Sequence, residues 1–98
     1  MADVDVQERV EITIDLGDMW NVIFHNDDRT SMDFVVFALM AIFNKSTSEA
    51  VNLMLSIHNN GKATVASYSC YDIAEQKAKE TIVLAREYGY PLSVTVEK

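Results

Sequence analysis

The chain has 98 residues, 49% of them hydrophobic, which fits one domain with a single core. Fifteen acidic against eight basic residues give a net charge of −7, which argues against nucleic acid as a partner because phosphates attract clustered Lys and Arg. The sequence shows no bilayer-spanning apolar run and no signal-peptide pattern, and its single cysteine excludes an internal disulfide. We therefore expect a cytoplasmic protein without membrane contact.

Two parts of the chain differ in composition. Residues 1–18 are mostly polar and acidic and predict a mobile N-terminal extension, in which Val10–Leu16 alternates as an added edge strand would. Residues 19–98 carry the periodic patterns of a folded core domain.

The first elements of this domain are a strand and a helix. Apolar and polar residues alternate over 20–25, which predicts a strand. Thr30 or Ser31 is expected to cap the helix that follows. The apolar residues of this helix recur at helical spacing: Val35, Leu39, Ile42 and Phe43.

A second helix and a second strand come next. Ser46 with Glu49 three residues later predicts a capping box at the start of the helix. Gly61, in the sequence NNG, is expected to end it in a left-handed conformation. The run KATVASYS, residues 62–69, is partly β-branched and predicts a strand.

The last elements are a third helix and a third strand. Asp72 and Glu75 are expected to form another capping pair, and Gly89 with Pro91 to end the helix. LSVTV, residues 92–96, alternates as a strand. The order β-α-α-β-α-β predicts a small α+β domain with three helices on one face of a mainly antiparallel three-stranded sheet.

Candidate functional residues gather at the first strand-to-helix junction, FHNDDRTSMDFV. Each has a structural explanation beside a functional one. Helix capping would account for Asp28 and Thr30, core packing for the nearby Met and Val, and the helix dipole for His58 near a helix end. Asn26 and Asp27 are harder to explain structurally, because one cap needs one acceptor and adjacent carboxylates repel unless a cation is near.

A metal site is one interpretation of this junction. His25, Asn26, Asp27, Asp28 and His58 offer nitrogen and oxygen ligands. However, the chain has no H-x-x-x-H or H-E-x-x-H spacing, and neighbouring strand residues face opposite ways. Residue patterns alone predict an acidic α+β domain with a polar junction beside methionine and other apolar residues, and they do not choose between these interpretations.

Longer motifs resemble one family. WNVIFHNDDRTSMDFVVFALMAIFNKS, then AVNLMLSIHNNGKA, DIAEQKAKE and YPLSVTVEK resemble, in this order, the ClpS family. The resemblance covers Trp20 to Lys98. It implies an α/β sandwich of three strands and three helices. It also implies an adaptor that brings proteins with destabilising N-terminal residues, or N-degrons, to an AAA+ protease.

The resemblance also implies a site for the first residue of a polypeptide. Its α-amino group would be held by Asn26, Asp27 and His58. The side chain would enter an apolar pocket whose implied lining is Met32, Val35, Met54 and Leu92, with Asp28 and Thr30 at its lip. Met32 matches the position of a gatekeeper against β-branched first residues.

Other positions concern the partner and the departures from the family pattern. Asp72, Glu75 and Lys77 match the surface that docks on the N-terminal domain of the unfoldase. Arg29 and Ser31 stand where a Tyr and a Pro are common, and YSCYDIAEQK is one residue longer than the usual turn.

The sequence thus predicts a monomeric, non-enzymatic adaptor, without cofactor or metal, for a ClpA- or ClpC-type unfoldase and its ClpP protease. One alternative is a small metal-dependent enzyme using His25, Asp27, Asp28 and His58. Another is a structural interaction domain without an amine pocket, like the C-terminal domain of the ribosomal stalk protein.

Overall fold

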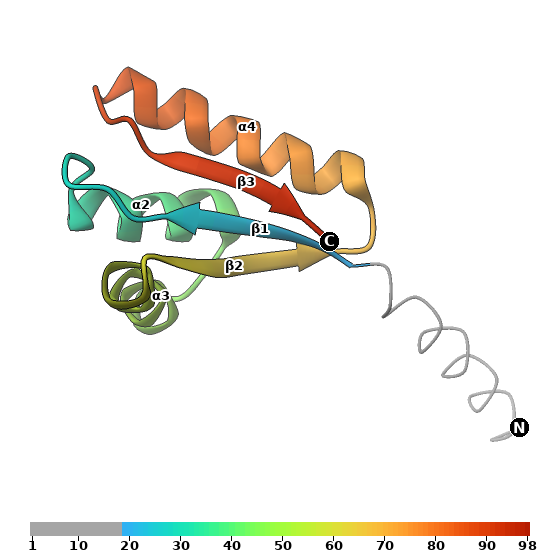
Figure 1. The fold of residues 1–98 in the computed structure, drawn as a ribbon, viewed down its shortest axis with the longest axis horizontal. Coiled ribbons are helices and arrows are strands. Elements are labelled where there is room, and N and C mark those ends of the chain that lie inside the picture. The colour runs from blue at the N-terminus through green and yellow to red at the C-terminus, as the bar shows by residue number, and fades with distance from the viewer. Residues whose placement is uncertain (1–18) are drawn as a thin grey trace, which may run out of the picture.

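The computed structural model describes residues 19–98, so the extension predicted for 1–18, with its strand at Val10–Leu16, lies outside the described residues. The elements of the described part are β1 (Trp20–His25), α2 (Met32–Phe43), α3 (Thr47–Asn60), β2 (Lys62–Tyr68), α4 (Tyr71–Glu87) and β3 (Ser93–Glu97). This order confirms the predicted β-α-α-β-α-β arrangement (Figure 1).

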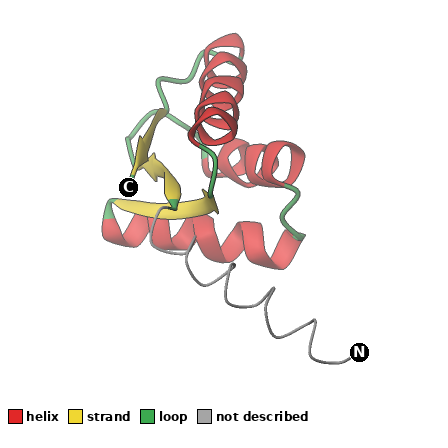
Figure 2. Cartoon of the chain, turned by 90° about the vertical axis from the view of Figure 1, so that its right-hand side faces the viewer, coloured by secondary structure: helices red, strands yellow, loops and turns green. Residues whose placement is uncertain are grey.

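The three strands form an antiparallel sheet in the order β2-β1-β3. Phe24 on the central strand lies opposite Ala63 on β2 and Val94 on β3. Figure 2 shows the three helices on one side of this sheet, as the sequence predicts. Among residues 19–98, no helix combines the length and the apolar character that a membrane crossing requires.

Because the strand residues alternate, the sheet has one face packed against the helices and an opposite face that is mainly polar, on which Ile23 is also buried. Val22 and Phe24 point into the core and are fully buried. On the other face, Asn21 accepts a hydrogen bond from the Ser67 hydroxyl at 2.6 Å. The helices contribute most of the rest of the core, with Phe34, Val35, Ala38, Leu39, Ile57, Ala78 and Ala85. Leu92, in the connection between α4 and β3, is also part of this core.

Side-chain caps fix the start of α2 and α3. The Ser31 hydroxyl accepts a hydrogen bond from the Phe34 N–H at 3.0 Å, so Ser31, and not Thr30, is the cap of α2. Ser46 and Glu49 form both bonds of the predicted capping box. Gly61 ends α3 with φ of 88°, as predicted.

The start of α4 differs from the prediction. Its N-cap residue is Cys70, which makes no side-chain capping bond, and Asp72 lies inside the first turn. The predicted Asp72–Glu75 capping pair is therefore wrong. The helix begins one residue before Asp72, where the Tyr71 ring packs edge-on against Trp20 with ring centroids 4.9 Å apart.

Candidate functional site

Asp27 organises the loop between β1 and α2. Its Oδ1 accepts hydrogen bonds from the N–H groups of Arg29, at 2.8 Å, and Thr30, at 2.7 Å. Its Oδ2 accepts one from the Thr30 hydroxyl at 2.8 Å. An aspartate that bonds the backbone two and three residues later holds the chain in a turn. The carboxylate thus fixes the path from the strand end to the helix.

These bonds also set the charge state of Asp27. Burial alone would raise its pKa, but the N–H groups of Thr30 and Arg29, the Thr30 hydroxyl and the Arg29 charge together outweigh burial. The pKa of Asp27 is consequently held below its ordinary value of 3.8. The loop therefore carries an ionised carboxylate at neutral pH, and Arg29 supplies part of the positive charge that two adjacent aspartates require.

A backbone bond ties this loop to the end of α3. The Asn26 N–H donates to the Gly61 carbonyl at 2.8 Å, and the Gly61 N–H donates to the Ile57 carbonyl at 2.9 Å. His58 lies in the last turn of α3, between these two anchor residues. The side chains of Asn26 and His58 are both exposed. The structure thus joins the two segments that carry the predicted amine-binding residues.

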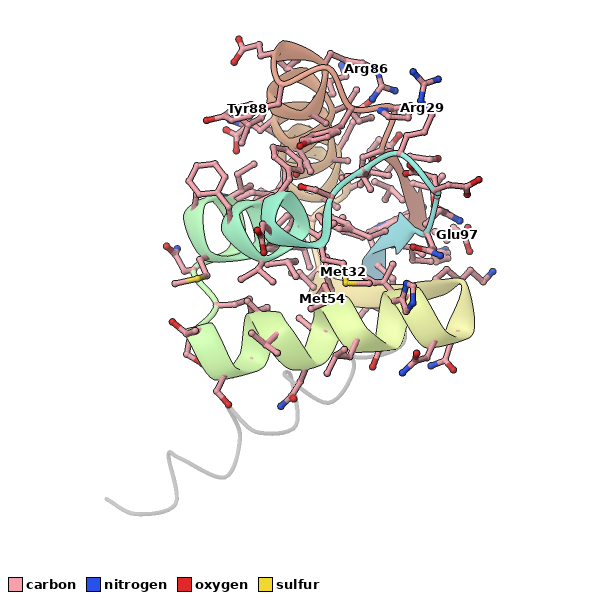
Figure 3. All side chains as sticks on the ribbon, turned by 90° about the vertical axis from the view of Figure 1, so that its left-hand side faces the viewer. Arg29, Met32, Met54, Arg86, Tyr88 and Glu97 are labelled. Carbon is pink, nitrogen blue, oxygen red and sulfur yellow. The ribbon has the colours of Figure 1, made fainter. Side chains whose placement is uncertain are left out.

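Three of the predicted apolar residues belong to the packed pair α2 and α3, and the fourth, Leu92, lies just before β3. Val35 and Leu92 are buried in the core, and Met54 packs against the same cluster. Met32, at the start of α2, is 45% exposed. Figure 3 shows Met32 and Met54 next to each other between the two helices. Two methionines, one of them accessible, therefore line the surface between α2 and α3.

Leu92 is held in place from α4. Arg86 Nη1 donates to the carbonyl of Tyr90 at 2.9 Å and to that of Leu92 at 3.1 Å. These two carbonyls lie on either side of Pro91, which has no N–H of its own to donate. Arg86 thus fixes the turn that brings Leu92 into the core.

The predicted docking residues lie in the first half of α4. Glu75 pairs with Lys79 at 3.8 Å on the exposed surface. Lys77 Nζ donates to the carbonyl of Ile42 near the end of α2 at 3.1 Å. Figure 1 shows the start of α4 at the end of the molecule opposite the β1–α2 loop. The structure therefore does not bring the docking residues and the amine-binding residues together.

The metal interpretation finds no support in the geometry. Within the part of the chain that the structure describes, no three His, Cys, Asp or Glu side chains lie close enough to hold an ion. Of the residues in that interpretation, His25 has its Nε2 at 2.8 Å from the Thr95 hydroxyl on the polar face of the sheet.

The sequence did not reveal an aromatic cluster beside α2. Phe34 has ring centroids 6.3 Å from Phe37, 5.3 Å from Tyr88 and 5.2 Å from Tyr90. These rings line a hollow of about 320 Å³ together with Ser31 and Asp33. A partial signal was present, because Phe34 and Phe37 are three residues apart on one helix while Phe37 falls outside the buried stripe.

The left-handed conformation of Gly61 at the end of α3 can be tested by substitution. Gly61→Ala is expected to cost about 1 kcal/mol, because an L-residue at φ of 88° is strained although no atom lies within 4 Å of the added Cβ. A domain of this size should lose roughly 4–8 °C in melting temperature, measured by circular dichroism. Gly61→Asn is the control and should lose less, because asparagine adopts the left-handed conformation more readily. Equal losses of melting temperature for both variants would contradict the claim that residue 61 is strained in the left-handed conformation.

Together, the fold and the site define a small α+β recognition module, in which a braced polar loop adjoins a methionine-lined apolar surface. The family model described as "ATP-dependent Clp protease adaptor protein ClpS" matches residues 16–95. The chain therefore belongs to the ClpS family of adaptor proteins, which confirms the predicted family and the prediction of an adaptor rather than an enzyme.

Relatives and a solved structure agree with this assignment. A ClpS adapter of Helicobacter hepaticus is 39% identical over 98 residues, which cover 100% of this chain and 98% of the relative. One of Treponema denticola is 47% identical over 79 residues, covering 81% of this chain and 77% of the relative. The structure of Agrobacterium tumefaciens ClpS2 bound to L-phenylalaninamide matches with a TM-score of 0.78 and 39% identity, over 82% of this chain and 95% of that one.

Proposed function

We propose that this adaptor binds the free α-amino group and the bulky hydrophobic first residue of N-degron proteins, namely Phe, Tyr, Trp or Leu. The observation that supports this most is the bond between Asn26 and Gly61, which holds the polar loop against the helix that carries His58 and Met54. A polar site and an apolar surface are thereby fixed side by side, as a ligand with an ammonium group next to a hydrophobic side chain requires.

The polar half suits an α-ammonium group. Such a group has three donors, and its pKa near ~8 keeps it mostly cationic at neutral pH. The Asn26 amide oxygen, the Asp27 carboxylate and a neutral His58 nitrogen are the three acceptors in the proposal. Asp27 already accepts three hydrogen bonds, but a carboxylate has about four lone-pair sites, so one remains for the ligand. Asp28, which is exposed, adds negative charge at the lip.

The apolar half suits a large unbranched side chain. Met32 and Met54 have unbranched thioethers that adapt to rings and to aliphatic side chains alike. Val35 and Leu92 are the buried floor, and Thr30 borders the opening. L-phenylalaninamide, the ligand of the Agrobacterium protein, combines a free α-amine with a benzyl side chain, and its amide stands in for a peptide bond. That ligand supports the proposal that this site also requires a free α-amine and a large side chain.

Met32 is the gatekeeper in this proposal. Valine and isoleucine carry two heavy atoms on Cβ, so they are wide close to the backbone. A methionine at the rim fills the space that this width would need. The exposed position of Met32 at the first residue of α2 supports such a role.

Delivery is assigned to the other end of the molecule. We place the contact with the N-terminal domain of a ClpA- or ClpC-type unfoldase, which works with ClpP, at Asp72, Glu75 and Lys77. Because Lys77 already bonds Ile42 and Glu75 already pairs with Lys79, Asp72 is the more available charged group. The 17 residues of α4 span about 25 Å, so cargo and unfoldase would bind without competing. The adaptor would act as a cytoplasmic monomer without a cofactor.

Three fluorescein-labelled peptides test this function by anisotropy. They are a peptide that begins with Phe, the same peptide N-acetylated, and one that begins with Val. We expect saturable binding of the free Phe peptide and loss of at least tenfold in affinity for the other two, because each lacks one of the two features that the site requires. Equal binding of the acetylated peptide would contradict the amine site, and equal binding of the Val peptide would contradict the gate.

A further inference from the structure

The aromatic cluster forms a second concave surface, on the other flank of α2 from Met32. Phe34, which is buried, is its floor, and Phe37 and Tyr88 are its walls, with 46% and 58% of their surface exposed. Figure 3 shows α2 between Met32 and Tyr88. Large aromatic side chains that remain this exposed around a hollow are typical of an interaction surface.

The chemistry of this hollow favours a cation. The faces of aromatic rings carry partial negative charge and attract Lys and Arg side chains within about 6 Å. Asp33, which also lines the hollow, is exposed and adds a carboxylate. Within residues 19–98, the structure records Lys79 with Glu75 as its ion pair, so Asp33 has no cationic partner in that part of the chain. The net charge of −7 for the whole chain also attracts cationic ligands.

The hollow begins where the proposed amine site ends. Successive residues of segment 30–33 contribute in turn to the proposed pocket and to the hollow. Thr30 and Met32 belong to the pocket, and Ser31 and Asp33 line the hollow. A helix is about 10 Å across, and an extended chain covers about 3.3 Å per residue. An extended polypeptide whose first residue occupies the pocket would therefore need about three to four residues to reach the hollow.

We infer that the hollow formed by Phe34, Phe37, Tyr88 and Tyr90 with Asp33 binds an arginine or lysine side chain of the cargo, a few residues after its N-terminus. This inference rests on the proposed function, because it requires the first residue to be seated beside Met32. It adds a second determinant to cargo selection, since a cation at the right position adds contacts that the first residue does not make.

The test is an arginine scan. Peptides that begin with Phe and are otherwise uncharged carry Arg at one of positions 2 to 6, and each is paired with the same peptide carrying citrulline, which has nearly the shape of arginine without its charge. We expect about three- to tenfold tighter binding for Arg than for citrulline at one or two neighbouring positions. The gain should shrink in high salt, because exposed charges are screened.

Variants identify the surface that gives this gain. Phe37→Leu keeps an apolar side chain but removes the ring, and it should reduce the Arg gain at least twofold while the citrulline peptides bind as before. Val83→Ala, at a position of α4 that is 58% exposed and outside the hollow, is the control and should preserve the gain. Asp33→Asn is the less specific variant, because a carboxylate in the first turn also stabilises the helix.

The outcomes separate this inference from the function on which it rests. Failure of every peptide to bind would overturn both. Binding of the citrulline peptides without any gain from Arg would overturn the inference and leave the proposed function standing. An Arg gain that Phe37→Leu leaves unchanged would place the cation elsewhere and overturn the inference as well.

Discussion

Replacing Asp27 by alanine is expected to weaken the binding of every peptide with a free N-terminus, whatever its first side chain. The variant removes the proposed charged acceptor of the ammonium group, and it also removes three hydrogen bonds that hold the loop. Hydrogen bonds to charged groups are worth about 1.5–3 kcal/mol, so affinity should fall at least tenfold. Anisotropy with Phe-, Leu- and Trp-first peptides measures this loss, which should be similar for all three.

Two further variants separate the charge of Asp27 from its role in the turn. Asp27→Asn retains an oxygen for the N–H groups of Arg29 and Thr30 and removes the charge. Thr30→Val removes the hydroxyl donor and retains the charge. We expect the Asp27→Asn variant to lose most of its affinity for the peptides and the Thr30→Val variant to lose little. If Asp27→Asn bound like the parent while Asp27→Ala did not, Asp27 would act through the turn alone and its assignment to the amine would be wrong.

The pH dependence of binding follows from the same carboxylate. Because the pKa of Asp27 is held below 3.8, its charge persists throughout the range above pH 5 and drops only as the pH falls through that lowered value. The loss of affinity on the alkaline side should therefore follow the peptide ammonium group, near pH ~8.

Replacing Met32 by alanine is expected to admit peptides that begin with Val or Ile. The shorter side chain leaves room at the rim of the pocket for two heavy atoms on Cβ. Affinity for a Val-first peptide should rise at least tenfold. Affinity for a Phe-first peptide should fall several-fold, because buried methylene contacts of about 0.8 kcal/mol each are lost. Anisotropy with the two peptides gives the selectivity as a ratio of dissociation constants.

Met40 supplies the matched control for this gate. It is a methionine of the same helix with similar exposure, 38% against 45% for Met32, and its sulfur accepts a hydrogen bond from the Thr47 hydroxyl at 3.9 Å. Met40→Ala should leave the selectivity ratio at its parental value. Continued rejection of Val by Met32→Ala would place the gate at another residue.

Local signals predicted most of the fold. Ser46 with Glu49 and Gly61 mark helix ends by chemistry that depends only on neighbouring residues. The start of α4 was mispredicted because Asp72 and Glu75 have the spacing of a capping pair. At the actual start, Cys70 makes no side-chain capping bond, and Tyr71 contacts Trp20, a residue 51 positions earlier in the chain that a local pattern does not include.

The binding roles of the candidate site residues stay predictions, whereas their positions in the fold are visible in the structure. These residues came from a resemblance, and the structure shows that Asn26 is bonded to the end of the helix that carries His58. The internal bonds of Asp27 were in principle readable from DDRT, because an aspartate commonly bonds the backbone two and three residues on. The aromatic hollow was not, because Tyr88 and Tyr90 meet Phe34 only in the folded chain.

Amide chemical shifts of the ¹⁵N-labelled chain, titrated with a Phe-first peptide and with its acetylated twin, test the central claim most directly. The account predicts that the free peptide shifts signals of residues 26–35 and 54–61 and leaves those of 71–77 unchanged. At the same concentrations, the acetylated peptide should shift the signals of 26–35 and 54–61 much less. Equal shifts from both peptides, or shifts confined to other parts of the chain, would contradict an amine-binding site at this loop.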